Sequence, residues 1–233
     1  MRHRFAAIAA VLVLTNVSCA ARSVSTRYEC VNADRELREA LQQLEQARAK
    51  SCNERDRQGI GLCVTQERGI ERLAYLCPAH APTLLANAAI AYDSHDPVKA
   101  QQYLDRVLAQ SRSQPDAAVL RAKLAIDEGN LPFARRFLTE QIKLAPDHAG
   151  LREVHGATLY LSGQLDEARQ ELRLARRMGA PDWRVAYHLG LVDEAAGQLD
   201  AARQEYAESV ARNPSWQPAR ARLTALQGAT QAR

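Results

Sequence analysis

Small apolar residues recur along the chain with a period of 34, and this pattern predicts pairs of packed helices. One set consists of Ala100, Ala134, Ala168 and Ala202. Twelve positions earlier stand Ala88, Ala122, Gly156 and Gly190. Four positions after each alanine, on the same helix face, stand Leu104, Leu138, Leu172 and Tyr206. A period of this length indicates stacked helix hairpins that bury their apolar faces against one another.

The turns between the predicted helices keep the same step. They carry His95, Gly129, Gly163 and Gly197. Glycine allows the positive φ that a short helix–helix turn requires. At the first turn, we expect Asp96 to be the N-cap of the next helix and Pro97 to be its first residue. Since two helices approach closely only through small side chains, we expect Gly190 to face Ala202 and Gly156 to face Ala168.

This pattern resembles the tetratricopeptide repeat, a helix–turn–helix of 34 residues with small residues at its eighth and twentieth positions. The resemblance covers about 60% of the chain. It implies an all-α, right-handed α-solenoid of four helix hairpins over residues 81–216. The four units are 81–114, 115–148, 149–182 and 183–216. A three-helix bundle would need the shared period to arise by coincidence.

Two further segments flank the repeats. Residues 217–233 contain a helical run with Leu223 and Leu226 inward, which we expect to cap the end of the stack. Residues 20–80 contain two helical patterns, 34–50 and 62–77, and predict a cysteine-containing hairpin. Asp34 is the expected cap of the first helix, with Leu41 on its buried face.

The hairpin segment contains four cysteines, Cys30, Cys52, Cys63 and Cys77. In an antiparallel hairpin, two of them lie at the turn and two at the open end. This geometry favours the disulfides Cys52–Cys63 and Cys30–Cys77 among three possible pairings. Free thiols are one alternative, and a Cys₃His metal site with His80 is another. The spacing lacks the paired Cys-x₂-Cys of common zinc sites, so we expect no metal.

The first 19 residues resemble a secretory signal peptide. A basic start is followed by ten apolar residues, too few to span a bilayer, and then by small residues. Cys19 stands where a bacterial lipoprotein carries its lipid, which implies an outer-membrane lipoprotein facing the periplasm. Ordinary cleavage after Ala20, giving a soluble periplasmic protein, is the competing interpretation.

Charge and motifs narrow the function. The net charge is +4, and removal of Arg2 and Arg4 with the signal peptide leaves +2, which argues against a nucleic-acid partner. Motifs typical of serine hydrolases, zinc proteases and phosphate-binding loops are absent from the sequence. His155 and His188 occupy different repeat positions and are not expected to converge. We therefore expect a non-enzymatic protein with no catalytic, cofactor or metal site.

The tetratricopeptide resemblance implies a partner-binding groove on the concave face, formed by the first helix of each unit. The corresponding residues are Leu85, Tyr92, Asp93, Val119, Lys123, Ile126, Glu153, Tyr160, Arg184, Tyr187 and Glu194. Tyr92, Tyr160 and Tyr187 would form a ladder for an extended or helical partner segment, with Lys123 and Arg184 orienting its acidic groups. The alternative is that Tyr92 and Tyr160 are partly buried between units.

By resemblance to exported repeat lipoproteins, the chain is expected to be a protein–protein adaptor of the bacterial cell envelope. Its partners would belong to pilus, secretion, motility or peptidoglycan machinery, and it would meet the membrane only through an N-terminal lipid. An accessory protein that binds a small envelope ligand such as a glycan is the alternative.

Overall fold

The computed structural model describes residues 30–50, 52, 54–56 and 58–231, with side chains up to residue 228. The predicted signal peptide and Cys19 lie outside these residues. The described part contains eleven α-helices, one short 3₁₀ helix and no β-strand. In chain order the elements are η1 (Cys30–Asn32), α1 (Ala33–Ala49), α2 (Leu62–Leu76), α3 (Ala81–Asp93), α4 (Pro97–Leu108), α5 (Pro115–Asp127), α6 (Leu131–Leu144), α7 (Ala149–Leu161), α8 (Leu165–Arg177), α9 (Asp182–Ala195), α10 (Leu199–Arg212) and α11 (Gln217–Gln231).

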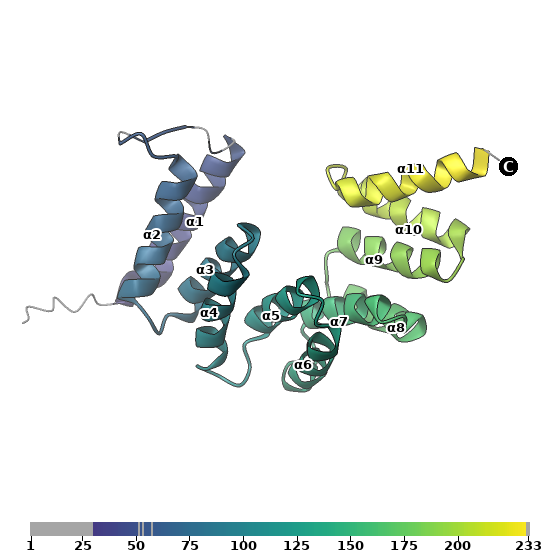
Figure 1. Cartoon of the computed structure of the whole chain (residues 1–233), viewed down its shortest axis with the longest axis horizontal. Helices are drawn as coiled ribbons and strands as arrows, with labels where there is room; N and C mark the ends of the chain where they lie inside the picture. The colour runs from purple at the N-terminus through teal and green to yellow at the C-terminus, as the bar shows by residue number, and fades with distance from the viewer. Residues whose placement is uncertain (1–29, 51, 53, 57, 232–233) are drawn as a thin grey trace, which may run out of the picture.

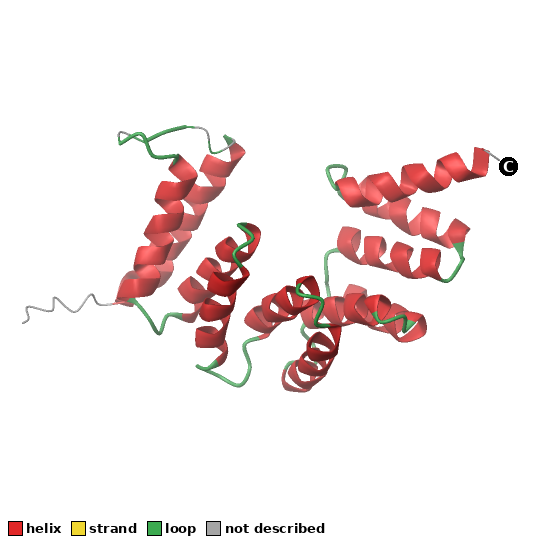
Figure 2. Ribbon diagram, in the orientation of Figure 1, coloured by secondary structure: helices red, strands yellow, loops and turns green. Residues whose placement is uncertain are grey.

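The helices form a curved stack of hairpins (Figures 1 and 2). Each of the pairs α3–α4, α5–α6, α7–α8 and α9–α10 packs within itself, and the first helices α3, α5, α7 and α9 also contact one another in succession. The α1–α2 hairpin stands at one end and α11 at the other, so the curve leaves an open side between the two ends (Figure 1). This is the all-α stack that the sequence pattern predicts.

The periodic residues form the core of each hairpin. The four alanines that begin with Ala100 are fully buried, and so are the residues four positions after them. The closest neighbours of the helical glycines differ from the expectation. A Cβ at Gly190 would meet the ring of Tyr206 at 2.5 Å, and one at Gly156 would meet Leu172 at 2.7 Å, ahead of the Ala168 carbonyl at 3.2 Å. The side chain one turn beyond each alanine therefore fills the space that the glycine leaves, and the expected approach of Gly156 to Ala168 is confirmed.

The turns adopt the left-handed conformation at every repeat. Gly129, Gly163 and Gly197 have φ near +75°, and His95 has φ +57° at the same position. Only glycine takes this conformation without a steric penalty, so His95 is a strained exception. Next to it, the Asp96 carboxylate accepts the Lys99 amide at 3.0 Å, which confirms the expected cap of α4.

Two disulfides fix the N-terminal hairpin. Cys30 is joined to Cys77 and Cys52 to Cys63, with Cα–Cα distances of 5.7 and 5.3 Å. This is the pairing favoured by the hairpin geometry. Asp34 lies inside the first turn of α1 instead of capping it, because α1 begins at Ala33, and its carboxylate contacts the imidazole of His80 at 3.1 Å. Leu41 is 38% exposed, so the buried face is narrower than expected.

The C-terminal helix α11 packs on α10 and covers the last hairpin. Ala219 is its fully buried residue, whereas Leu223 and Leu226 are only partly buried. Trp216 precedes α11 and packs on Trp183 of α9 with ring centroids 4.9 Å apart. Among the described residues, no helix is both long and apolar enough to cross a membrane.

Candidate interaction surface

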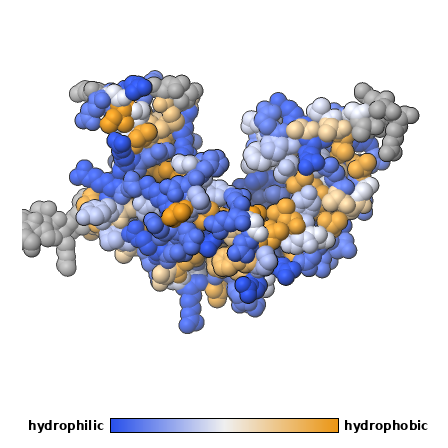
Figure 3. Space-filling model, in the orientation of Figure 1, coloured by the Kyte–Doolittle hydropathy of each residue, from blue (hydrophilic) through white to orange (hydrophobic). Residues whose placement is uncertain are grey.

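Residues from four successive first helices meet around Lys123, and we call the surface of α3, α5, α7 and α9 that carries them the inner surface. Burial and the charge of Arg184 lower the pKa of Lys123, while Glu153, Asp127 and Asp93 act in the opposite direction. These charges come from α3, α5, α7 and α9, so the structure gathers them on one surface. In the space-filling view, the molecule is hollowed between its two ends (Figure 3).

A compact charge cluster occupies the middle of the inner surface. The guanidinium of Arg184 donates two hydrogen bonds of 2.6 Å to the carboxylate of Glu153, which is 3% exposed. His188 lies 3.9 Å from the same carboxylate. Burial keeps the pKa of His188 below its ordinary value, so the ring stays neutral near neutral pH. The ion pair with Glu153 neutralises the charge of Arg184. The Lys123 ammonium, in contrast, has no ion-pair partner within the described residues.

Aromatic side chains line the C-terminal part of the inner surface. Tyr187 lies against Tyr206 and Trp216, with centroid distances of 6.0 and 6.1 Å. Burial raises the pKa of Tyr187, and Tyr160 acts in the same direction, which places the Tyr160 hydroxyl nearby. Tyr160 is partly buried against the core of units three and four. Both tyrosines are thus half-buried, so part of each ring is packed and part is exposed.

Glu194 bridges the last hairpin and the cap. It accepts the hydroxyl of Tyr206 at 2.6 Å and pairs with Arg222 of α11 at 3.1 Å. The predicted groove residue is therefore occupied by internal partners. At the other end of the stack, Asp93 pairs with Arg48 of α1 at 3.5 Å.

Tyr92 does not join the other tyrosines but bridges the first two units. Its hydroxyl donates to the Asp127 carboxylate at 2.6 Å, and burial together with this bond raises the pKa of Tyr92. Beside it, a cleft of about 230 Å³ is lined by Tyr92, His95, Pro97, Leu124, Asp127 and Glu128.

The remaining predicted groove residues contribute to packing. Leu85 lies against the core of the first unit, and Val119 and Ile126 lie against the core of the second. All three are half-buried. They support the inner surface and offer little area of their own to a partner.

Sequence reasoning missed three residues of this surface. Asp127 stands at the same repeat position as Asp93, so the 34-residue period could have indicated it. His188 was not expected at the site because the histidines do not share a repeat position. A single histidine can nevertheless lie beside a buried carboxylate, as His188 does beside Glu153. Trp216 is the last residue of the fourth unit, a repeat position at which the four units share no residue type.

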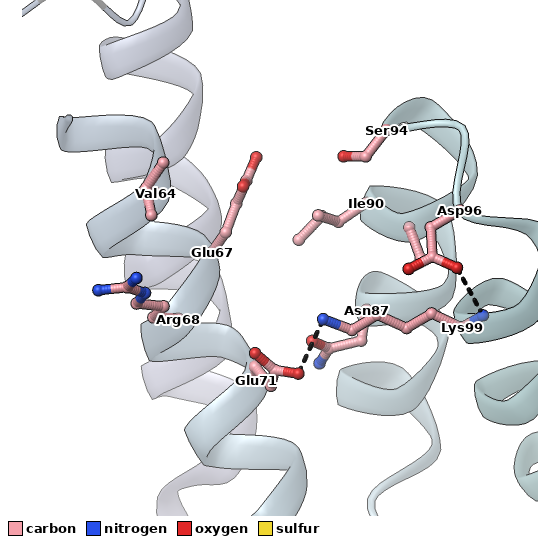
Figure 4. A pocket seen from close by; sticks show the side chains of 10 residues that line it. Val64, Glu67, Arg68, Glu71, Asn87, Ile90, Ser94, Asp96 and Lys99 are labelled. Atoms are coloured by element: carbon pink, nitrogen blue, oxygen red, sulfur yellow. Dashed lines mark hydrogen bonds and ion pairs between the residues drawn. The ribbon is translucent and has the colours of Figure 1, made fainter. Parts of the chain in front are cut away.

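A second cleft, of about 250 Å³, separates the N-terminal hairpin from the first repeat (Figure 4). Two ion pairs form at this cleft: Lys99 contacts Glu71 at 2.8 Å across it, and Glu67 lies 3.8 Å from Arg48. Figure 4 shows the Lys99 side chain reaching from α4 toward Glu71 on α2. An ion pair across this cleft therefore joins the hairpin to the first repeat. Across the described part of the chain, no three His, Cys, Asp or Glu side chains are arranged to hold a metal ion.

Comparisons with known proteins agree with this geometry. Residues 91–157 match the sequence model of the family described as tetratricopeptide repeat. No curated protein sequence matches the chain significantly. The fold is similar to TTC0263, a tetratricopeptide protein of Thermus thermophilus, at 17% identity over 83% of this chain and 98% of that one, with a TM-score of 0.66. It is also similar to PilW, described as a type IV pilus biogenesis factor, at 15% identity over 86% and 93% of the chains, with a TM-score of 0.63. MamA of Desulfovibrio magneticus matches at 14% identity over 80% and 97%, with a TM-score of 0.55. The predicted tetratricopeptide-type solenoid is thereby confirmed.

Proposed function

We propose that the protein is a non-catalytic adaptor whose inner surface binds a segment of a partner protein. The observation that carries this proposal is the arrangement around Lys123. A partly buried ammonium without an ion-pair partner in the described structure lies beside the neutralised Arg184–Glu153 pair. Tyr160 shares α7 with Glu153, and Tyr187 shares α9 with Arg184. A partly buried cation and half-exposed tyrosine rings on one surface are typical sources of binding energy in a protein interface.

The partner chemistry follows from this arrangement. Since Nε and Nη2 of Arg184 both donate to Glu153, whose charge neutralises the guanidinium, Lys123 is the cation left to receive an acidic side chain. Tyr160 and Tyr187 would pack on the neighbouring apolar residues, and their hydroxyls would bond the partner backbone. The two tyrosines and Lys123 together would favour an extended or helical segment with one acidic residue.

The proposed place of action is the bacterial cell envelope. The N-terminal sequence resembles a signal peptide with a lipid attachment at Cys19, and disulfides such as those of the α1–α2 hairpin persist in oxidising compartments. We infer an outer-membrane lipoprotein facing the periplasm. By analogy with the pilus biogenesis factor of similar fold, its partners would belong to an envelope assembly such as a pilus, secretion, motility or peptidoglycan machine.

The test is crosslinking capture from envelope membranes with the double variant Lys123→Gln and Tyr160→Ala. Tyr187 is left intact because its ring packs on Trp216 and its loss would loosen the cap. Removing two central contacts should lower capture about 30-fold or more. The control is Arg136→Gln on the exposed side of α6, which should capture as the wild type does. Wild-type capture by the folded double variant would place the binding surface elsewhere.

A further inference from the structure

We infer that the cleft between the α3–α4 turn and the end of α5 is a second subsite, which receives an arginine side chain of the partner. The inference rests on the proposed function, because the cleft adjoins the inner surface. Lys123 and Asp127 are one turn apart on α5, so both sites face the same ligand. The partner segment would therefore carry a basic residue, bound in this cleft, close to the acidic residue that binds Lys123.

The first argument is the electrostatics of the end of α5. A helix C-terminus carries a partial negative charge and is stabilised by cations. The last turn of α5 has no basic residue, yet it ends in Asp127, with Glu128 as its C-cap. Among the described residues, neither carboxylate has a cation within 4 Å of it, and Asp127 accepts only the hydroxyl of Tyr92. Three negative contributions therefore meet at one point without an ion pair, and Lys123, one turn away on α5, interacts with Asp127 only at longer range.

The second argument is a comparison with the two ends of the stack, where an acid on a first helix meets an internal arginine. Asp93, which is equivalent to Asp127 by the 34-residue period, pairs with Arg48 of α1. Glu194 of α9 pairs with Arg222 of α11. Both cations come from elements outside the repeats. Asp127 lies on the second repeat unit and pairs with no arginine of the described residues, so an equivalent arginine would come from another molecule.

The third argument is the shape and lining of the cleft. Its apolar part is formed by the Tyr92 ring, Pro97 and Leu124, of which Leu124 is 2% exposed. The carboxylates of Asp127 and Glu128 lie at its edge and are exposed. An arginine places its aliphatic stem on apolar surface and its planar head between carboxylates. An acidic side chain would be repelled here, and a purely apolar one would leave both carboxylates without an ion pair.

The experiment titrates the full chain with N-acetylarginine methylamide and follows amide NMR shifts. The matched probe is the citrulline analogue, which has nearly the same shape and no charge. The arginine probe should give saturable shifts at residues 124–129 with a dissociation constant of about 1–10 mM, and citrulline should bind at least about fivefold more weakly. Equal binding of both probes, or shifts without saturation or localisation, would overturn the inference.

Two variants locate the site. Glu128→Gln should weaken the arginine probe about fivefold or more, and so should Asp127→Asn, whose amide oxygen still accepts the Tyr92 hydroxyl. Glu167→Gln removes the same charge from an exposed position on α8 and should change nothing. Unchanged binding in both cleft variants would refute the subsite.

The outcomes separate this inference from the proposed function. If the probe does not bind while partner capture still depends on Lys123 and Tyr160, the subsite is refuted and the adaptor function stands. If the probe binds through Glu128 while capture ignores Lys123 and Tyr160, the arginine subsite is supported and the proposed centre of the inner surface is wrong.

Discussion

Gly190→Ala should destabilise the protein because the added methyl group has no space. An ideal Cβ at this position lies 2.5 Å from Cε1 and 2.6 Å from Cδ1 of Tyr206. The ring cannot move aside easily, since Tyr206 is fully buried and its hydroxyl is held by Glu194 at 2.6 Å. Overpacking costs about 1–3 kcal/mol, and the better helix propensity of alanine returns at most about 1 kcal/mol. We expect a net loss of about 1–2 kcal/mol.

The assay is thermal and urea unfolding followed by circular dichroism. A loss of this size lowers the melting temperature by about 2–8 °C in a chain of this length. Gly69→Ala is the matched control, because Gly69 also lies inside a helix but a Cβ there meets no atom within 4 Å. That substitution should raise stability by about 0.5–1 kcal/mol through helix propensity alone. The two substitutions are chemically identical and differ only in the space around them.

A compensating second substitution sharpens the test. In the second unit, Ala122 stands at the position of Gly190 and Leu138 at the position of Tyr206, and both are fully buried. Gly190→Ala combined with Tyr206→Leu recreates that pair. The double variant should be more stable than the sum of the single effects by about 1 kcal/mol. Stability of Gly190→Ala at or above wild type, or strictly additive effects in the double variant, would refute this account of the packing.

Three further outcomes are expected. Replacing Cys30 and Cys77 by serine should lower the free energy of unfolding by about 2–4 kcal/mol, measured by urea titration without reductant, and peptide mapping that finds another cysteine pairing would contradict the bridge. Cys19→Ala should move the protein from the membrane to the soluble fraction, whereas a soluble wild-type protein would favour ordinary signal cleavage. Because burial lowers the pKa of His188 from 6.5, the unfolded chain binds more protons than the folded one, and stability should decrease as the pH falls below about 6.5. His188→Gln should reduce this dependence of stability on pH. If the variant loses stability as steeply as the wild type, other groups cause the dependence.

The stacked-hairpin fold could be predicted from the sequence because the same packing contacts recur in every repeat unit. A 34-residue period fixes which residues face one another in every hairpin, and the buried set from Ala100 to Tyr206 agrees with it. The disulfide pairing could also be predicted, because an antiparallel hairpin brings the ends of its two helices together. The resemblance also led to the inner surface, where Lys123, Glu153 and Arg184 lie close together.

The sequence could not show which charged groups are already neutralised. Arg184 and Glu194 were both expected to meet a partner, yet each forms an ion pair inside the protein. These pairs join residues 28 to 31 positions apart, and their geometry depends on the angle between successive hairpins. A repeat pattern specifies the helix faces but leaves that angle open, so the distinction between internal and available charges required the structure.

The two ends of the stack are stabilised differently, so unfolding should begin at one end and progress toward the other. Covalent bridges hold the α1–α2 hairpin, whereas α11 is held by packing and ion pairs. In a solenoid each hairpin is supported mainly by its neighbours, so fraying should start at α11 and progress toward the bridged end. Hydrogen exchange should therefore become slower from α11 toward α3. A partner held by α5, α7 and α9 would interrupt this process, and binding would appear as protection of the C-terminal half of the chain.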